Sequence, residues 1–338
     1  MSSDLLLEVK TVEESQDSAG YFPLQNGRYE IKPGMMPLDT DFSNQSDSKL
    51  FQLDSNFNSY RQVKLAARKS SLSKYYQIYN YNDSVAQAVA QLIINRLTIE
   101  YPQYFHLVND GNQLILNCQL TKEILYFNQN FELLKYKLLD KSIFPDYISS
   151  LDALAAQVQS DILVISRNQN SDNWMSAIHL CYPNHFSAAE KIGQDFVNVH
   201  LPVAGMEKIN QRAKAIVNTM IVRKPTVRFA WGLSTDTRLN HHPQPPSEIK
   251  SKQWYGRDFD INNPKLFLRI ERQVMWGLPE SNAAMFTIRT YFRDCREIKK
   301  DTLLKHKLIS AIESMTPKSL IYKGLVESKQ DILAWLNQ

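Results

Sequence analysis

The chain has 338 residues, of which 43% are hydrophobic and 22% are charged, so it is long and apolar enough to bury a substantial core. Its formal charge of +4 comes from 39 basic and 35 acidic residues spread along the sequence, which does not indicate a nucleic-acid-binding protein. Three separated cysteines form no CxxC pair, which argues against a disulfide framework and fits a reducing compartment. The N-terminus matches neither a signal peptide nor a transit peptide, and no apolar run approaches the roughly 20 residues of a membrane-spanning helix. We therefore expect a cytoplasmic protein that does not enter a membrane.

Residues 1–60 are polar, carry turn signals at Asn26-Gly27 and Pro33-Gly34, and contain little that could form a long helix. We expect an N-terminal arm that lies over the core; the alternative is that this segment is disordered. The apolar side chains available to dock it are Tyr21, Phe22, Leu24, Met35, Leu38, Phe51 and Leu53. Residues 61–338 are then expected to form a single α+β domain.

Apolar residues at helical spacing predict a helix over Asp83–Ile99 and a second helix over Ser150–Ile162. Between them, short apolar runs rich in aromatic and β-branched residues predict strands over Gln113–Leu120 and Ile124–Phe131. Periodicity does not decide whether Asp161–Arg167 continues the second helix or forms a strand.

The middle of the chain contains two further helix signals. The run from Ser187 to Glu190 has the pattern of a capping box, which predicts a short helix that Gly193 can end. A loop that carries His200 is expected to follow, and an apolar stripe then predicts a helix over Met206–Ile221.

Strands dominate the next part of the sequence. Val227–Leu233 is expected to be a strand, and Leu266–Val274 and Ala283–Tyr291 are expected to pair antiparallel through a turn around Gly277–Asn282. Further helices are expected near Thr302–Ser314 and Lys329–Leu336. This irregular order predicts an α+β fold with an antiparallel sheet, and the sequence has neither GxGxxG nor GxxxxGK, the patterns of phosphate-binding loops.

Charged residues alternate with apolar ones in Leu266–Val274, which places Arg269 and Glu271 on one face and Arg272 on the other, otherwise apolar, face. A guanidinium there must meet a carboxylate, a carbonyl or a ligand anion, because an unpaired buried charge is prohibitive. Arg289 on the following strand has the same requirement. One interpretation is structural, with Arg269 and Glu271 as cross-strand ion-pair partners. The other is a polar wall beside a buried ligand.

His200 follows VNV and precedes LPVAG, so we expect an apolar strand end to deliver its imidazole into a loop stiffened by Pro202. This arrangement suits an axial iron ligand whose other ring nitrogen is fixed by a carbonyl or carboxylate, and a hydrogen-bonded loop histidine is the structural alternative. His179, Cys181 and His185 match no familiar zinc spacing, although Cys181 remains a rival iron ligand. The sequence also lacks the GxSxG and HExxH motifs of serine hydrolases and zinc proteases.

Four segments stand in a fixed order along the chain: SAAEKIGQDFVNVHLPVAG, VRFAWGLSTDTRL, LFLRIERQVMWGLPESNAAMFTIRTY and LIYKGL. Together with the earlier NGRYEIKPGMMPLD, LFQLD and ALAAQVQSD, they resemble the heme-dependent oxidative N-demethylase family, specifically its heme-binding alpha subunit. The resemblance covers most of the chain. It departs from the family pattern at Ala204, Gly277 and Ser160, where a proline, a basic residue and an acidic residue are usual.

The resemblance implies a PAS-like fold, in which an antiparallel sheet flanked by helices encloses a b-type heme. It also implies a monooxygenase in which heme iron and O₂ hydroxylate a methyl group of a small methylated amine, and the carbinolamine then releases formaldehyde. Electrons would come from a partner reductase or ferredoxin-type subunit that carries FMN and a 2Fe–2S centre. The oligomeric state is left open.

The same resemblance implies roles for individual residues. His200 is the expected proximal iron ligand, Glu271 is expected to hold the substrate ammonium or relay protons, and Arg272 and Arg228 are expected to pair with heme propionates or with that carboxylate. Trp231 offers an aromatic face to a cationic substrate. The predicted cofactor-binding set is His200, Arg228, Trp231, Arg269 and Arg289, and the predicted catalytic residues are Glu271 and Arg272.

Two other functions fit the same sequence. A PAS-like heme or small-molecule sensor would bind its ligand without turnover. A family member that has lost heme would serve as a binding or structural subunit. An absorption spectrum and amine-dependent consumption of O₂ would separate these functions from the monooxygenase.

Overall fold

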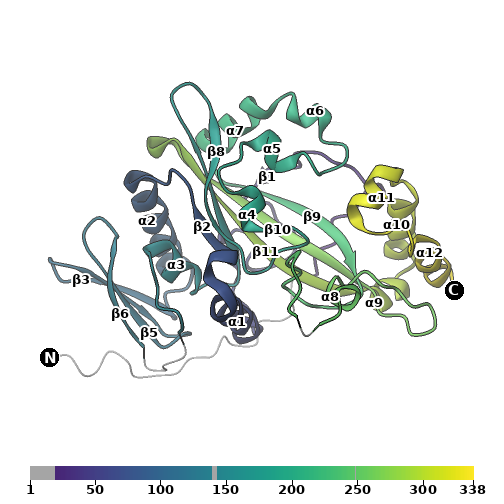
Figure 1. The fold of residues 1–338 in the computed structure, drawn as a ribbon, viewed down its shortest axis with the longest axis horizontal. Coiled ribbons are helices and arrows are strands. Elements are labelled where there is room, and N and C mark those ends of the chain that lie inside the picture. The colour runs from purple at the N-terminus through teal and green to yellow at the C-terminus, as the bar shows by residue number, and fades with distance from the viewer. Residues whose placement is uncertain (1–19, 139–142, 248) are drawn as a thin grey trace.

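The computed structural model describes residues 20–138, 143–247 and 249–338, and these residues build two antiparallel sheets flanked by helices (Figure 1). The larger sheet has seven strands in the order β1-β9-β10-β11-β7-β8-β2. These strands are β1 (Met36–Pro37), β2 (Tyr76–Ile78), β7 (Asp161–Arg167), β8 (Asn173–His179), β9 (Thr226–Ser234), β10 (Phe267–Leu278) and β11 (Ala283–Asp294). The predicted α+β class with an antiparallel sheet is confirmed.

The smaller sheet pairs four consecutive strands in the order β3-β4-β5-β6. They are β3 (Phe105–Asn109), β4 (Leu114–Cys118), β5 (Glu123–Phe127) and β6 (Leu133–Leu138). Helices α2 (Asp83–Glu100) and α3 (Ser150–Ala155) lie between the two sheets (Figure 1). One continuous group of buried apolar side chains runs from Leu116 through Ile93 to Val274, so the two sheets share a core.

Strand register divides the central hairpin into two faces. Glu271 lies opposite Ala230 and Thr290, whereas Arg272 lies opposite Phe229 and Arg289. Because successive side chains of a strand point to opposite sides, we name these the Glu271 face and the Arg272 face.

Different helices cover the two faces. The Glu271 face packs against α4 (Ala188–Lys191) and α7 (Ala213–Val222), with α5 (Phe196–His200) and α6 (Glu207–Asn210) beside them. The Arg272 face packs against α2 and against C-terminal helices, namely α9 (Cys295–Lys300), α10 (Thr302–Glu313) and α12 (Lys329–Asn337). The remaining helical segments are α1 (Phe57–Tyr75), α8 (Ser251–Trp254), η1 (Pro279–Ser281) and α11 (Pro317–Lys323). No helix in the described ranges combines the length and apolar character needed to cross a membrane.

The apolar side chains of the N-terminal segment are largely withdrawn from solvent within residues 20–56. Those that are buried are Tyr21, Phe22, Leu24, Leu38, Phe51 and Leu53, while Met35 is half-buried. Residues 1–19 lie outside the described part of the chain. The division into an arm over 1–60 and one domain over 61–338 stays a prediction.

Several element predictions are confirmed, including α2, β4, β5, β9 and the β10–β11 hairpin. The helix predicted over Ser150–Ile162 is wrong beyond Ala155, and Asp161–Arg167 forms β7. The physical reason is that Asp161–Ser166 is buried on both faces, so its continuous apolar run has no strand-like alternation. The single helix predicted over Met206–Ile221 is instead two helices, α6 and α7.

Candidate functional site

His200 ends the short helix α5, so the expectation that an apolar strand delivers it is wrong. Asp195 caps this helix by accepting a hydrogen bond from the Asn198 N–H at 2.7 Å. His200 Nδ1 lies 2.7 Å from the carbonyl oxygen of Phe196. Because a carbonyl can only accept, Nδ1 carries the proton and Nε2 of the neutral ring presents a lone pair.

The surroundings of His200 keep its ring neutral. Burial lowers its pKa, the Phe196 carbonyl opposes this, and the positive charges of Arg228 and Lys191 lower the pKa further. None of the described residues hydrogen-bonds to Nε2. A half-buried neutral imidazole with one nitrogen fixed by a carbonyl has the properties of a metal-ligating histidine.

Glu271 and Arg228 lie close together on the Glu271 face. The Glu271 carboxylate accepts hydrogen bonds from Gln273 Nε2 at 3.0 Å and from Asn184 Nδ2 at 3.4 Å, and its side chain is 13% exposed. Burial lowers the pKa of Arg228, and the charge of Glu271 opposes that shift. Within the described ranges, Arg228 Nε is buried without a hydrogen-bond partner, so this guanidinium has an unused donor.

Lys323 extends the same group of charges from the end of α11, which lies beside β9 (Figure 1). Its Nζ donates a hydrogen bond to the Trp231 carbonyl at 2.6 Å. Burial lowers the pKa of Lys323 to about 8, Glu271 opposes the shift, and Arg257 and Arg228 add to it. These mutual effects place four charged side chains, Arg228, Arg257, Glu271 and Lys323, in one electrostatic cluster.

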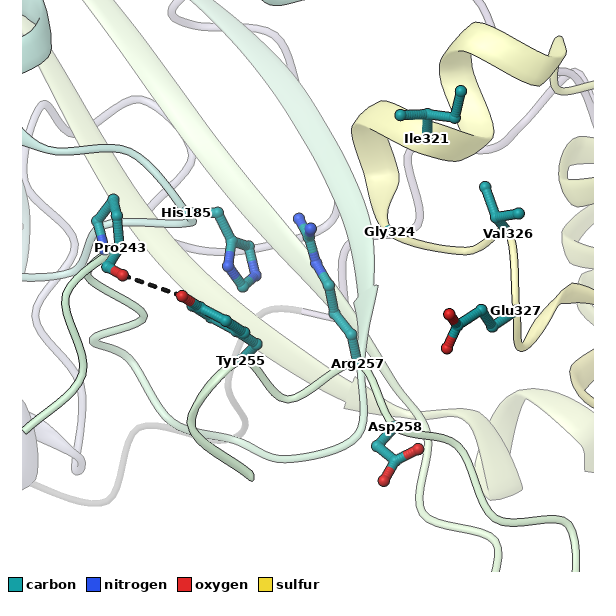
Figure 2. A pocket seen from close by; sticks show the side chains of 9 residues that line it. All are labelled: His185, Pro243, Tyr255, Arg257, Asp258, Ile321, Gly324, Val326 and Glu327. Atoms are coloured by element: carbon teal, nitrogen blue, oxygen red, sulfur yellow. Dashed lines mark hydrogen bonds between the residues drawn. The ribbon is translucent and has the colours of Figure 1, made fainter. Parts of the chain in front are cut away.

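A cavity of about 510 Å³ is lined by Arg257 of this cluster and opens between residues 255–258 and the end of α11 (Figure 2). Its lining residues are His185, Pro243, Tyr255, Arg257, Asp258, Ile321, Gly324, Val326 and Glu327. Arg257 and Tyr255 could not be nominated as site residues from the sequence, because they meet Ile321 and Gly324 of the same cavity across about 70 residues of chain. The segment LIYKGL, which carries part of the family resemblance and contains Lys323 and Gly324, was the one sequence feature that pointed to this region.

His185 supplies a second neutral imidazole on this side of the molecule. Its backbone has a φ of +66°, an uncommon conformation for a residue with a side chain. The ring stacks on His241 with centroids 5.2 Å apart and lies 5.9 Å from the ring of Tyr255. Burial, reinforced by the charge of Arg257, lowers the pKa of His185 to about 2. His185 is therefore neutral at physiological pH.

Arg272 lies on the opposite side of the sheet from Glu271. It is 1% exposed, and its Nη2 donates hydrogen bonds to the carbonyl oxygens of Asp47 at 2.7 Å and Lys49 at 2.9 Å. The predicted pairing of Arg272 with the Glu271 carboxylate does not fit this position. Arg272 instead anchors the N-terminal segment with the carbonyl partners that its burial requires.

Two more predicted site residues share the Arg272 face. Arg289 forms an ion pair with Asp54 at 2.6 Å, and its guanidinium carbon lies 3.8 Å from the ring centroid of Tyr60. The Trp231 ring lies 5.7 Å from Tyr29 in an edge contact. Neither side chain faces Glu271, so the predicted set is divided between the two faces of the sheet.

Arg269 is on the Glu271 face but is held by the protein itself. It is 2% exposed and donates to the carbonyl oxygens of Arg238, Tyr182 and Leu239 at 2.9–3.1 Å. Its Nε is 4.0 Å from Glu271 Oε1, a contact within one strand and not the cross-strand pair that was expected. These bonds join the 238–239 loop to the sheet.

Cys181, the rival iron ligand, is part of a buried chain of polar groups. Its Sγ is 3.9 Å from His179 Nδ1, and His179 Nε2 is 3.3 Å from Asp152 Oδ1. Burial and the charge of Asp161 raise the pKa of the Cys181 thiol, which is 2% exposed as a residue. A protonated thiol without solvent access is neither a nucleophile nor a thiolate ligand. No group of three or more His, Cys, Asp or Glu side chains within the described ranges is placed to hold a metal ion.

Comparison with known protein families confirms the family that the sequence motifs resemble. A family model described as "Haem-dependent oxidative N-demethylase, alpha subunit-like" matches residues 41–333. The matched region contains His200, Glu271 and Lys323, and it spans both sheets from β2 to β11.

Proposed function

The chain belongs to the family of haem-dependent oxidative N-demethylase alpha-subunit-like proteins, and from this premise we propose that it is a heme monooxygenase that demethylates a small methylated amine. The proposal includes a b-type heme in a PAS-like arrangement on the Glu271 face. The observation that supports it most is the state of His200, which is neutral, half-buried, and bonded to a carbonyl through Nδ1.

The residues on this face fit a heme group. His200 Nε2 offers a lone pair that could hold the heme iron. Arg228 has a buried Nε–H without a partner in the described ranges, which suits a propionate carboxylate. Heme, when bound, supplies the O₂ chemistry that hydroxylates a methyl carbon.

Glu271 is proposed to bind the ammonium group of the substrate. The amides of Gln273 and Asn184 fix the carboxylate without neutralising its charge, so it can form a charge-assisted hydrogen bond to a cation. Glu271 is also a candidate to accept the hydroxyl proton of the carbinolamine. As that proton leaves, the C–N bond breaks toward nitrogen, formaldehyde departs, and the amine nitrogen takes up a proton.

Arg272, Arg289 and Arg269 are assigned a different role from the one that the sequence predicted. Their guanidinium groups meet carbonyl oxygens or Asp54, so they stabilise the sheet and the segments packed on it. They would support the site by holding the strands that carry Glu271 and Arg228 in register.

The remaining parts of the proposal concern the setting of the reaction. Membership in an alpha-subunit-like family supports a multi-subunit enzyme. We propose that a reductase subunit with FMN and a 2Fe–2S centre delivers the electrons, and that the complex works in the cytoplasm.

Turnover by the heme-loaded chain tests this function. Given a reductant and a panel of methylated amines, the protein should consume O₂ and release formaldehyde with at least one of them. Glu271→Gln should lose most of this turnover and keep its heme, whereas Glu280→Gln, which alters an exposed carboxylate in η1, should behave as the wild type. Heme binding without formaldehyde from any amine would reject the enzyme and favour a sensor.

A further inference from the structure

Arg257 brings a guanidinium without a protein partner into the cavity of about 510 Å³ (Figure 2). Among the described residues, no hydrogen bond or ion pair holds it, and burial lowers its pKa. Arg269, Arg272 and Arg289 differ from the half-buried Arg257, since they are fully buried and meet carbonyls or a carboxylate. Arg257 therefore has its full hydrogen-bonding capacity available for a ligand anion.

Gly324 makes the position of Arg257 possible. This glycine has a φ of +66°, and a Cβ added to it would lie 2.4 Å from Arg257 Cδ and 2.6 Å from Nη1. The absence of a side chain at residue 324 thus leaves the space that the arginine occupies beside the end of α11. Within the described ranges the Arg257 side chain therefore packs on Gly324 and has no ion-pair partner.

The other walls of the cavity suit a positively charged, methylated group. The Tyr255 hydroxyl donates to the Pro243 carbonyl at 3.1 Å, which fixes the phenol ring as part of the lining. The Glu327 carboxylate is exposed and forms no ion pair within the described ranges, and Figure 2 shows it directed into the cavity. Ile321 and Val326 add apolar side chains that are 68% and 58% exposed. Aromatic, carboxylate and apolar surfaces together recognise methylated ammonium groups.

From this distribution of charge we propose that the cavity binds an N-methylated amino acid, with its carboxylate on Arg257 and its methylated ammonium near Tyr255 and Glu327. The inference rests on the proposed demethylase function and narrows its substrates to methylated amines that carry a carboxylate. A simple dialkylamine would leave the Arg257 guanidinium unpaired as the cavity fills, whereas a carboxylate can bind its two N–H groups at once.

The cavity adjoins the residues proposed for catalysis. The charges of Arg257 and Glu271 both shift the pKa of Lys323, so both groups lie near the same ammonium group. A ligand held by Arg257 is therefore bound within the electrostatic cluster that contains Glu271.

Calorimetric titration of the purified full-length chain tests the proposal with two probes, N,N-dimethylglycine and its methyl ester, which lacks the carboxylate. The wild type should prefer dimethylglycine. Arg257→Gln should weaken dimethylglycine binding roughly 10- to 100-fold, the effect of losing a charge-assisted pair, and leave ester binding unchanged. Arg257→Lys keeps the charge without the bidentate geometry, so its affinity for dimethylglycine should fall between those of the wild type and Arg257→Gln. This second variant keeps the proposal testable if the glutamine variant folds poorly.

Arg296→Gln is the matched control, because Arg296 is an exposed arginine on α9 that pairs with Asp294 outside the cavity. Equal binding of the two probes, no binding of either, or identical results for the Arg257→Gln and Arg296→Gln variants would overturn the inference. Formaldehyde release from dimethylamine without carboxylate preference would overturn it and leave the demethylase function standing. Carboxylate preference in a chain that never takes up heme would support the inference about the cavity and reject the demethylase function.

Discussion

Replacing Gly277 by alanine should push α7 away from β10, because the added Cβ meets backbone atoms that cannot rotate aside. The Cβ would lie 2.1 Å from the carbonyl oxygen of Ile221, 2.7 Å from its carbonyl carbon and 2.9 Å from the carbonyl oxygen of Met220. Since non-bonded carbon contacts are comfortable near about 3.5 Å, the helix or the strand must shift by about 1 Å.

Overpacking of this kind costs about 1–3 kcal/mol, and alanine recovers about 0.5–1 kcal/mol relative to glycine within a strand. We therefore expect the free energy of unfolding to fall by about 1–2 kcal/mol, measured from the midpoint of urea denaturation at constant slope. Gly232→Ala is the matched control on the neighbouring strand, because its Cβ would meet only Lys323 Nζ, at 3.9 Å. If the Gly277 and Gly232 variants unfold at the same urea concentration, the tight contact between α7 and β10 does not exist as described.

Three further predictions concern buried groups. Arg289→Met should lower the free energy of unfolding by about 3–5 kcal/mol, because it leaves the mostly buried Asp54 carboxylate unpaired; a urea midpoint equal to that of the wild type would contradict this. Burial raises the pKa of Asp161 to about 7, so its folded-state proton stabilises the chain at low pH, and this contribution is lost as pH rises from about 4 through 7. Asp161→Asn should therefore become more stable relative to the wild type by up to about 1 kcal/mol per pH unit across that range, measured by urea denaturation at pH 5 and pH 8, and a constant difference would refute it. A thiol reagent at pH 8 should label the native chain slowly and the urea-unfolded chain fully, because all three cysteines are buried and burial raises each pKa: Cys118, Cys181 and Cys295.

Local sequence patterns predict those helices and strands whose apolar spacing can be recognised within one short stretch of the chain. Helix α2 has one buried stripe, with Val85, Val89 and Leu97 fully enclosed, and its apolar spacing reports this directly. Alternation in β10 likewise predicts Glu271 and Arg272 on opposite faces, and the strand register confirms it. The same method failed at Asp161–Arg167, because a strand covered on both faces has no alternation.

The candidate site was predictable only in part, for a related reason. The imidazole of His200 and the carboxylate of Glu271 could be nominated from sequence, but the partners of the arginines could not. Arg272 is paired through carbonyl oxygens about 225 residues away, and backbone carbonyls have no sequence signature. Arg257 could not be nominated from the sequence, because its role as an anion-binding group depends on its packing against Gly324 and on the lack of a counter-ion among the described residues.

The absorption spectrum of the chain expressed with ample heme, compared between the wild type and two histidine variants, tests the proposed heme site most directly. His200→Ala removes the imidazole whose Nδ1 is fixed by a carbonyl, and His185→Ala removes another neutral imidazole on that side of the sheet. We predict a Soret band in the wild type that is lost or shifted by His200→Ala and unchanged by His185→Ala. A colourless wild type that rejects added hemin, or a band that survives His200→Ala and disappears in His185→Ala, would contradict the assignment.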